Sequence, residues 1–126
     1  MFVVVIVLAV QVAACGGDDE RTSKAAKWLK KYSRMNPPNG DWVAIQIKAD
    51  GGDRVVMDVL VPYKAHVDQI KSRTKIEQSH IVGLACPPKD AEIWTILDKD
   101  QLLWVNLMAR TESGLNEVLI GASCKR

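Results

Sequence analysis

The clearest structural pattern in this chain is VAIQIKADGGDRVVMDVLV, residues 43–61. Its first part alternates Val43, Ile45 and Ile47 with smaller or polar residues, and the alternation of apolar residues resumes from Val55 to Val61. Asp50-Gly51-Gly52-Asp53 lies between the two parts and supplies the positive φ angles of a tight turn. The stretch therefore predicts a β-hairpin whose apolar side, which begins with Val43, Ile45 and Ile47, faces a core.

Helices are predicted on both sides of this hairpin. The first helix would be capped by Thr22 or Ser23 and would run to about Met35, where Asn36-Pro37-Pro38-Asn39-Gly40 ends it. It would bury one apolar stripe. The stripe consists of Ala25, Trp28, Leu29, Tyr32 and Met35. After the hairpin, residues 63–72 favour a helix, and a capping-box pattern at Thr74-Lys75-Ile76-Glu77 begins a second helical piece, so we expect a break near Arg73.

The last third of the chain favours strands. Three runs, Ala91–Leu97, Gln101–Ala109 and Glu117–Cys124, are separated by polar turns. The sequence therefore predicts an α+β fold class: an N-terminal helix, a β-hairpin, one or two central helices and a three-stranded antiparallel meander, with about five strands and the helices on one face.

Length and composition are those of one ordinary globular domain. The chain has 126 residues, of which 48% are hydrophobic and 25% charged, and its net charge is +2. These values argue against a disordered or collagen-like chain and against a strongly basic nucleic-acid binder. We expect no nucleic acid among its partners.

The first fifteen residues have the layout of an export signal. No charged side chain occurs before Asp18, and the apolar run is shorter than the roughly 20 residues that a membrane span needs. Val12-Ala13-Ala14-Cys15 resembles the lipobox of bacterial lipoproteins. The resemblance covers residues 1–15 and implies a cleaved signal peptide over 1–14, lipidated Cys15 with a short tether over 15–21, and a single α+β domain over 22–126.

The resemblance also implies a location. A lipidated Cys15 would anchor the protein to a membrane of the bacterial cell envelope so that the domain faces the periplasm, and Gly16 resembles residues that direct such proteins to the outer rather than the inner membrane. Two alternatives remain open. Residues 2–10 would be a buried strand of a cytoplasmic domain with three free thiols, or the prefix would be an uncleaved membrane anchor.

Two cysteines remain if Cys15 carries lipid. Cys86 and Cys124 would then share an oxidising compartment, so we expect them to form a disulfide. Cys124 points to the same face of its predicted strand as the apolar residues Val118, Ile120 and Ala122, and Cys86 lies at the end of a predicted helix that covers the sheet. A reactive or metal-binding thiol pair is the alternative, but neither cysteine has a neighbour at CxxC spacing.

Candidate catalytic residues are few. His80 shares a helical face with Ile76 and Leu84, which favours a half-buried core histidine, and His66 with Asp68 lacks a third metal ligand at recognisable spacing. No phosphate-binding loop or nucleophile elbow is present in the sequence. We therefore predict no catalytic residue, no metal and no cofactor. A small hydrolase-like periplasmic enzyme that uses His66 or His80 with a carboxylate is the alternative.

Two surfaces are candidates for interactions. The predicted first helix has a cationic side that could face anionic lipid, but a merely solvated helix face opposite the core stripe is the interpretation that we prefer. Its residues are Lys24, Lys27, Lys30, Lys31 and Arg34. The strands near the C-terminus are apolar on both faces, so either the protein buries both faces, which we prefer, or an exposed patch binds a partner. That patch would comprise Trp94, Ile96, Leu102 and Trp104.

The predicted function follows from these features. We expect a lipid-anchored envelope protein that is a non-enzymatic binding, accessory or assembly module. Its partner would be another envelope protein, a cell-wall component, or an envelope enzyme that it inhibits.

Overall fold

The computed structural model describes the backbone from residue 13 to residue 126 and the side chains from residue 19 onward. The predicted signal peptide, apart from the backbone of its last two residues, lies outside the described residues, as do the alternative strand over 2–10 and the side chain of Cys15. The elements in chain order are α1 (Ala13–Met35), η1 (Pro38–Gly40), β1 (Val43–Asp50), β2 (Arg54–Leu60), α2 (Lys64–Lys71), α3 (Lys75–Val82), η2 (Gly83–Ala85), α4 (Ile93–Ile96), β3 (Leu102–Arg110) and β4 (Asn116–Ser123).

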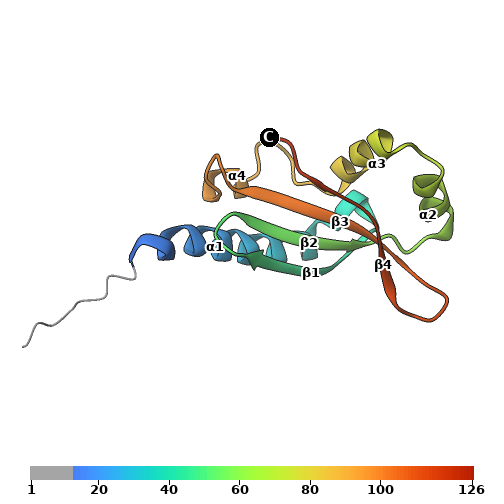
Figure 1. Ribbon diagram of the computed structural model, residues 1–126, viewed down its shortest axis with the longest axis horizontal. Coiled ribbons are helices and arrows are strands. Elements are labelled where there is room, and N and C mark those ends of the chain that lie inside the picture. The colour runs from blue at the N-terminus through green and yellow to red at the C-terminus, as the bar shows by residue number, and fades with distance from the viewer. Residues whose placement is uncertain (1–12) are drawn as a thin grey trace, which may run out of the picture.

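The fold is α+β, as predicted, with one four-stranded sheet in the order β1-β2-β3-β4 (Figure 1). The outer pairs β1–β2 and β3–β4 are antiparallel, whereas the central pair β2–β3 is parallel. The predicted antiparallel meander of three strands, in a sheet of about five, is therefore wrong. The chain leaves the end of β2, passes through the helices α2 to α4, and returns beside the start of β2, so that Val55 pairs with Leu103.

The segment Ala91–Leu97, predicted as a strand, contains the short helix α4 instead. Local hydrogen bonds and burial explain the difference. Trp94 Nε1 donates to the carbonyl of Pro88 at 2.8 Å, Thr95 Oγ1 donates to the carbonyl of Glu92 at 2.7 Å, and Ile93 is fully buried. A short apolar run is compatible with either state, and here tertiary packing selects the helix.

One face of the sheet carries the core. The buried cluster joins side chains of α1, α3 and α4 to alternate residues of the two central strands, and this confirms that the helices cover one face. Its most buried members include Leu29, Val55, Met57, Val59, Val82, Ile93, Leu103, Val105 and Leu107. In Figure 1, α4 lies near α1, whereas α2 and α3 lie toward the other end of the sheet, near β4.

Helix α1 begins earlier than the predicted cap at Thr22 or Ser23. Thr22 is instead a fully buried interior residue, and its Oγ1 donates to the carbonyl of Gly51 at 2.9 Å. That bond fastens the helix to the turn of the β1–β2 hairpin. Ala25 and Leu29 are buried as the apolar stripe predicts, but Met35 at the end of the stripe is 77% exposed.

The β1–β2 hairpin forms as predicted, and Gly51 in its turn has a φ of 68°. The predicted apolar face of β1 is only partly correct, however. A β-bulge between Ala44 and Gln46 shifts the register, so Ala44 and Ile47 pack against the core while Val43 and Ile45 are exposed. The bulge thus leaves two aliphatic side chains on an edge strand at the surface.

The predicted break between the central helices and the predicted disulfide are both present. Helix α2 ends at Lys71, and α3 begins after Thr74, whose Oγ1 accepts a hydrogen bond from the Glu77 amide at 3.3 Å. Cys86 follows η2 and is bonded to Cys124, with an S–S distance of 2.06 Å. The disulfide fastens the segment after β4 to the helical layer. In this structure Cys86 and Cys124 are therefore not free thiols.

Candidate functional site

The face of the sheet opposite the helices is the first candidate site. We call it the open face, and it is formed by Arg54, Val56, Asp58, Leu102, Trp104 and Asn106 of the central strands. Val56 is buried among its neighbours, whereas Leu102 is exposed and the four others are half-buried. The open face therefore combines an apolar floor with polar and aromatic groups that a partner can reach.

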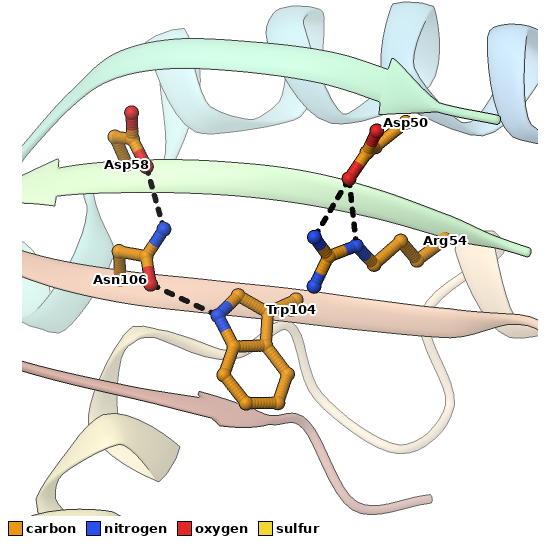
Figure 2. Close-up of polar contacts among 5 residues, drawn as sticks. All are labelled: Asp50, Arg54, Asp58, Trp104 and Asn106. Atoms are coloured by element: carbon orange, nitrogen blue, oxygen red, sulfur yellow. Dashed lines mark hydrogen bonds and ion pairs between the residues drawn. The ribbon is translucent and has the colours of Figure 1, made fainter.

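A chain of hydrogen bonds fixes the middle of the open face. Asn106 Nδ2 donates to Asp58 Oδ1 at 3.0 Å, and Trp104 Nε1 donates to Asn106 Oδ1 at 2.9 Å. Asp58 and Asn106 are directly paired residues of the parallel strands β2 and β3. Figure 2 shows the three side chains in a row across these strands. The oxygen of the Asn106 amide thus holds the Trp104 indole, and the nitrogen of the same amide is fixed by Asp58.

Arg54 completes the row at the start of β2. Its guanidinium lies 5.8 Å from the ring centroid of Trp104, and its Nε donates to Asp50 Oδ2 at 2.8 Å (Figure 2). Asp50 also forms an ion pair with Arg54 Nη2 at 2.7 Å. Two guanidinium nitrogens of Arg54 thus contact one carboxylate oxygen of Asp50, and this ion pair, together with the aromatic ring, holds a cation beside the indole.

Gly121 of β4 provides the space that the indole needs. A Cβ atom at Gly121 would lie 2.8 Å from Trp104 Nε1 and 2.5 Å from Asn106 Oδ1. A glycine in a strand often marks such a close approach. The row of side chains is therefore packed against the neighbouring strand and is ordered before any partner binds.

The predicted partner patch is divided between two parts of the molecule. Leu102 and Trp104 lie on the open face, whereas Trp94 and Ile96 belong to α4 and pack against the core. Arg126 lies over the Trp94 ring at 5.5 Å from its centroid. The prediction of one four-residue patch failed because it treated Ala91–Leu97 as a strand. The preferred alternative of full burial also fails for Leu102, which is 45% exposed.

Asp50 of β1, which binds Arg54, is absent from the predicted site residues. So are the polar members of the open face, namely Arg54, Asp58 and Asn106. Their alternation with buried residues along β2 and β3 was a usable signal. Their convergence depends on the parallel pairing of these strands, which the sequence pattern did not reveal.

The cationic side of α1 is the second candidate surface. All five predicted residues, Lys24, Lys27, Lys30, Lys31 and Arg34, are exposed. At 100° per residue they occupy one side of the helix, opposite Ala25 and Leu29. Among the described residues, none of the five takes part in an ion pair.

The histidines do not form a catalytic arrangement with a carboxylate. His66 Nδ1 accepts a hydrogen bond from Trp42 Nε1 at 3.2 Å, and the imidazole also lies edge-on to Tyr63, 5.2 Å between ring centroids. Asp68, the predicted companion of His66, forms an ion pair with Lys64 instead. His80 is exposed together with Ile76 and Leu84, so its predicted core position is wrong.

A groove of about 630 Å³ lies between α2 and the β3–β4 hairpin. Two of its cations are neutralised within the groove, because Lys64 lies 2.7 Å from Asp68 and Lys71 lies 3.2 Å from Glu117. Neither histidine lines it. The groove therefore does not bring either histidine to a candidate catalytic position.

Neither a metal cluster nor a membrane span is found in the described part of the chain. Within that part, no three His, Cys, Asp or Glu residues are placed to hold a metal ion, and no helix has the length and hydropathy needed to cross a bilayer. No family model, curated protein or solved structure matches this chain. Functional inference therefore depends on the chain's own residues.

Proposed function

We propose that this protein is a lipid-anchored protein of the bacterial cell envelope, held at the membrane through Cys15, and that its domain is a binding module rather than an enzyme. The observation that carries the proposal is the bond between Cys86 and Cys124, which leaves Cys15 as the remaining cysteine. A disulfide between these two is expected of a protein in an oxidising compartment. Cys15 itself directly follows the apolar prefix that resembles an export signal.

The anchor would consist of acyl chains on Cys15. Several chains on one residue give stable membrane attachment, whereas a single chain gives marginal attachment. Gly16 resembles the residues that allow transport of such proteins to the outer membrane, so that the domain would face the periplasm from that membrane.

The binding role is assigned to the open face. Tryptophan and arginine are enriched among the residues that dominate protein–protein affinity, and here Trp104 and Arg54 lie side by side in fixed orientations. Such preorganisation lowers the entropy lost on binding. The half-exposed ring, the exposed Leu102 and the Asp58 carboxylate offer apolar and polar contacts to another envelope protein.

The anchor is tested by the mass and location of the protein. Protein extracted from membranes is expected to begin at Cys15 and to carry the added mass of a diacylglycerol and an acyl chain. Cys15→Ser should lack this added mass, whereas the double variant Cys86→Ser with Cys124→Ser should still carry it. An extracted protein with an unmodified Met1 and an unmodified Cys15 would contradict the proposal.

The binding role is tested by crosslinking on intact membranes followed by purification. Trp104→Ala is expected to abolish a crosslinked partner that the native protein retains. Trp94→Ala is the matched control, because Trp94 lies on α4 outside the open face, and it should retain the partner. Equal loss from both variants, with both folded, would remove the open face from the proposal.

A further inference from the structure

Positive charge is concentrated on α1. Six of the 17 Lys and Arg residues lie between Arg21 and Arg34, a segment without any Asp or Glu. The remainder of the chain has 11 cations against 15 carboxylates and so has a net charge of −4. The small overall charge of +2 therefore conceals a strong asymmetry, which an anionic surface would use to orient the protein.

The five exposed cations of α1 form a compact stripe. From Lys24 to Arg34 the helix rises about 15 Å, so the stripe presents its charges over a length comparable to a few lipid headgroups. No cation of the stripe is neutralised by a carboxylate of the described residues. Along the chain, the carboxylates closest to it are Glu20 and Asp41.

Exposed aliphatic side chains adjoin this stripe. Lys30 and Arg34 line a shallow hollow of about 310 Å³ together with Ile45 of β1, and Arg34 also lines a second hollow with Val43. Ile45 is 40% exposed and Val43 is 48% exposed, because the β-bulge turns them away from the core. Met35, at the end of the same helix, is exposed as well.

Cations beside exposed aliphatic groups are what an interfacial membrane contact requires. The charges attract anionic headgroups, and the apolar groups enter the boundary between headgroups and acyl chains. A soluble anionic polymer would use the charges but would gain little from Val43 and Ile45. The combination therefore favours a phospholipid surface as the occupant.

We infer that the surface formed by the cationic stripe of α1 together with Met35, Val43 and Ile45 lies on an anionic phospholipid bilayer. This surface, the α1–β1 face, would hold the domain in one orientation against the membrane. The inference deepens the proposed function, since it assigns the domain its own membrane contact in addition to the anchor at Cys15. The open face is not part of the contact.

The experiment measures binding to vesicles without the anchor. The mature chain from residue 15 onward with Cys15→Ser, which lacks both the lipid and the apolar prefix, is mixed with vesicles of phosphatidylcholine that contain either no phosphatidylglycerol or about 30% of it, and the bound fraction is measured by sedimentation. We expect binding to the anionic vesicles to be at least about 100-fold stronger, given about fivefold for each cation at the surface. High salt should remove most of this preference.

Two charge variants in the same background test the assignment. Replacing all five stripe residues by Gln should abolish the preference for anionic vesicles. The matched control replaces five other exposed lysines, none of them in an ion pair among the described residues, and should leave the preference intact. These are Lys48, Lys75, Lys89, Lys99 and Lys125. Equal losses from both variants would mean that only net charge matters, and this would overturn the inference.

The aliphatic groups are tested by the double variant Val43→Thr with Ile45→Thr, which keeps β-branched side chains in the strand. We expect weaker binding to anionic vesicles at constant salt, with circular dichroism unchanged. Leu115→Thr, at an exposed position of the β3–β4 hairpin, is the control and should bind as before. Unchanged binding of the double variant would overturn the assignment of Val43 and Ile45 to the membrane contact. An anionic polymer would then be the better occupant of the surface. Binding to polyphosphate with a strength equal to that for anionic vesicles would lead to the same conclusion.

The inference and the proposed function can fail separately. If Cys15 is unmodified in the native protein but the Cys15→Ser variant still prefers anionic vesicles, the anchor is refuted and the α1–β1 face is supported. A lipidated native protein whose Cys15→Ser chain shows no such preference would refute the α1–β1 face and leave the anchor intact.

Discussion

The indole of Trp104 lies so close to Gly121 on the neighbouring strand that a Cβ atom there would be 2.8 Å from Nε1. The indole is also held by Asn106, which is itself bonded to Asp58. Gly121 pairs directly with Asn106, and Trp104 packs across it from the diagonal position. The packing of the open face therefore depends on glycine at position 121, because a side chain there would displace Trp104 and Asn106.

Gly121→Ala is expected to destabilise the fold by about 1–3 kcal/mol, because the added methyl group must displace Trp104 and Asn106. Urea denaturation followed by tryptophan fluorescence measures the change. Gly83→Ala is the matched control, since nothing lies within 4 Å of a Cβ at Gly83 and its φ of −56° suits alanine. Gly83→Ala should be neutral or slightly stabilising. A Gly121→Ala protein as stable as the native one would refute the close packing.

Asn106→Asp should lower stability by roughly 0.5–1 kcal/mol, because it places a second carboxylate directly opposite Asp58 on the paired strand. Exchanging the residues, Asp58→Asn with Asn106→Asp, restores an amide beside a carboxylate. We expect the double variant to recover most of the loss in thermal unfolding. If the double variant is as unstable as the sum of both single variants, the pair does not interact as the structure indicates.

Removing the Cys86–Cys124 bond by a double serine substitution should reduce the free energy of unfolding by about 3.5–4 kcal/mol, since the bond closes a long loop in the unfolded chain. The sequence separation of the two cysteines is 38 residues. Cys15→Ser, which leaves the bond in place, should unfold at the native urea midpoint. A loss below about 1 kcal/mol would show that the bond contributes little.

Thr22→Val removes a buried hydroxyl at nearly constant volume and should cost about 1 kcal/mol, because the hydrogen bond from α1 to Gly51 in the hairpin turn is lost. Hydrogen exchange of the hairpin amides measures whether this attachment loosens. Ser23→Ala, at the exposed neighbouring position, should change neither stability nor exchange. Identical behaviour of the two variants would count against the attachment.

The features predictable from sequence are those that depend on local pattern and spacing. The hairpin followed from alternation around Gly51-Gly52, the buried stripe of α1 from the spacing of Ala25 and Leu29, and the cap of α3 from Thr74. The disulfide was predicted from the cysteine count and an expected oxidising compartment, and the α+β class from the order of elements. Each is set by interactions over a few residues or by chemistry that does not depend on the fold.

Tertiary structure alone decided the rest. The helical state of α4 arises because Ile93 packs into the core while Trp94 bonds back to Pro88, and no periodicity in a run this short reveals that choice. The parallel pairing of β2 with β3 depends on where the chain returns after its helices, whereas the bulge of β1 is a feature of the β1–β2 pairing. The parallel pairing brings Arg54, Asp58, Trp104 and Asn106 together on the open face. The bulge exposes Val43 and Ile45 beside Arg34, so the proposed surfaces exist only in the folded chain.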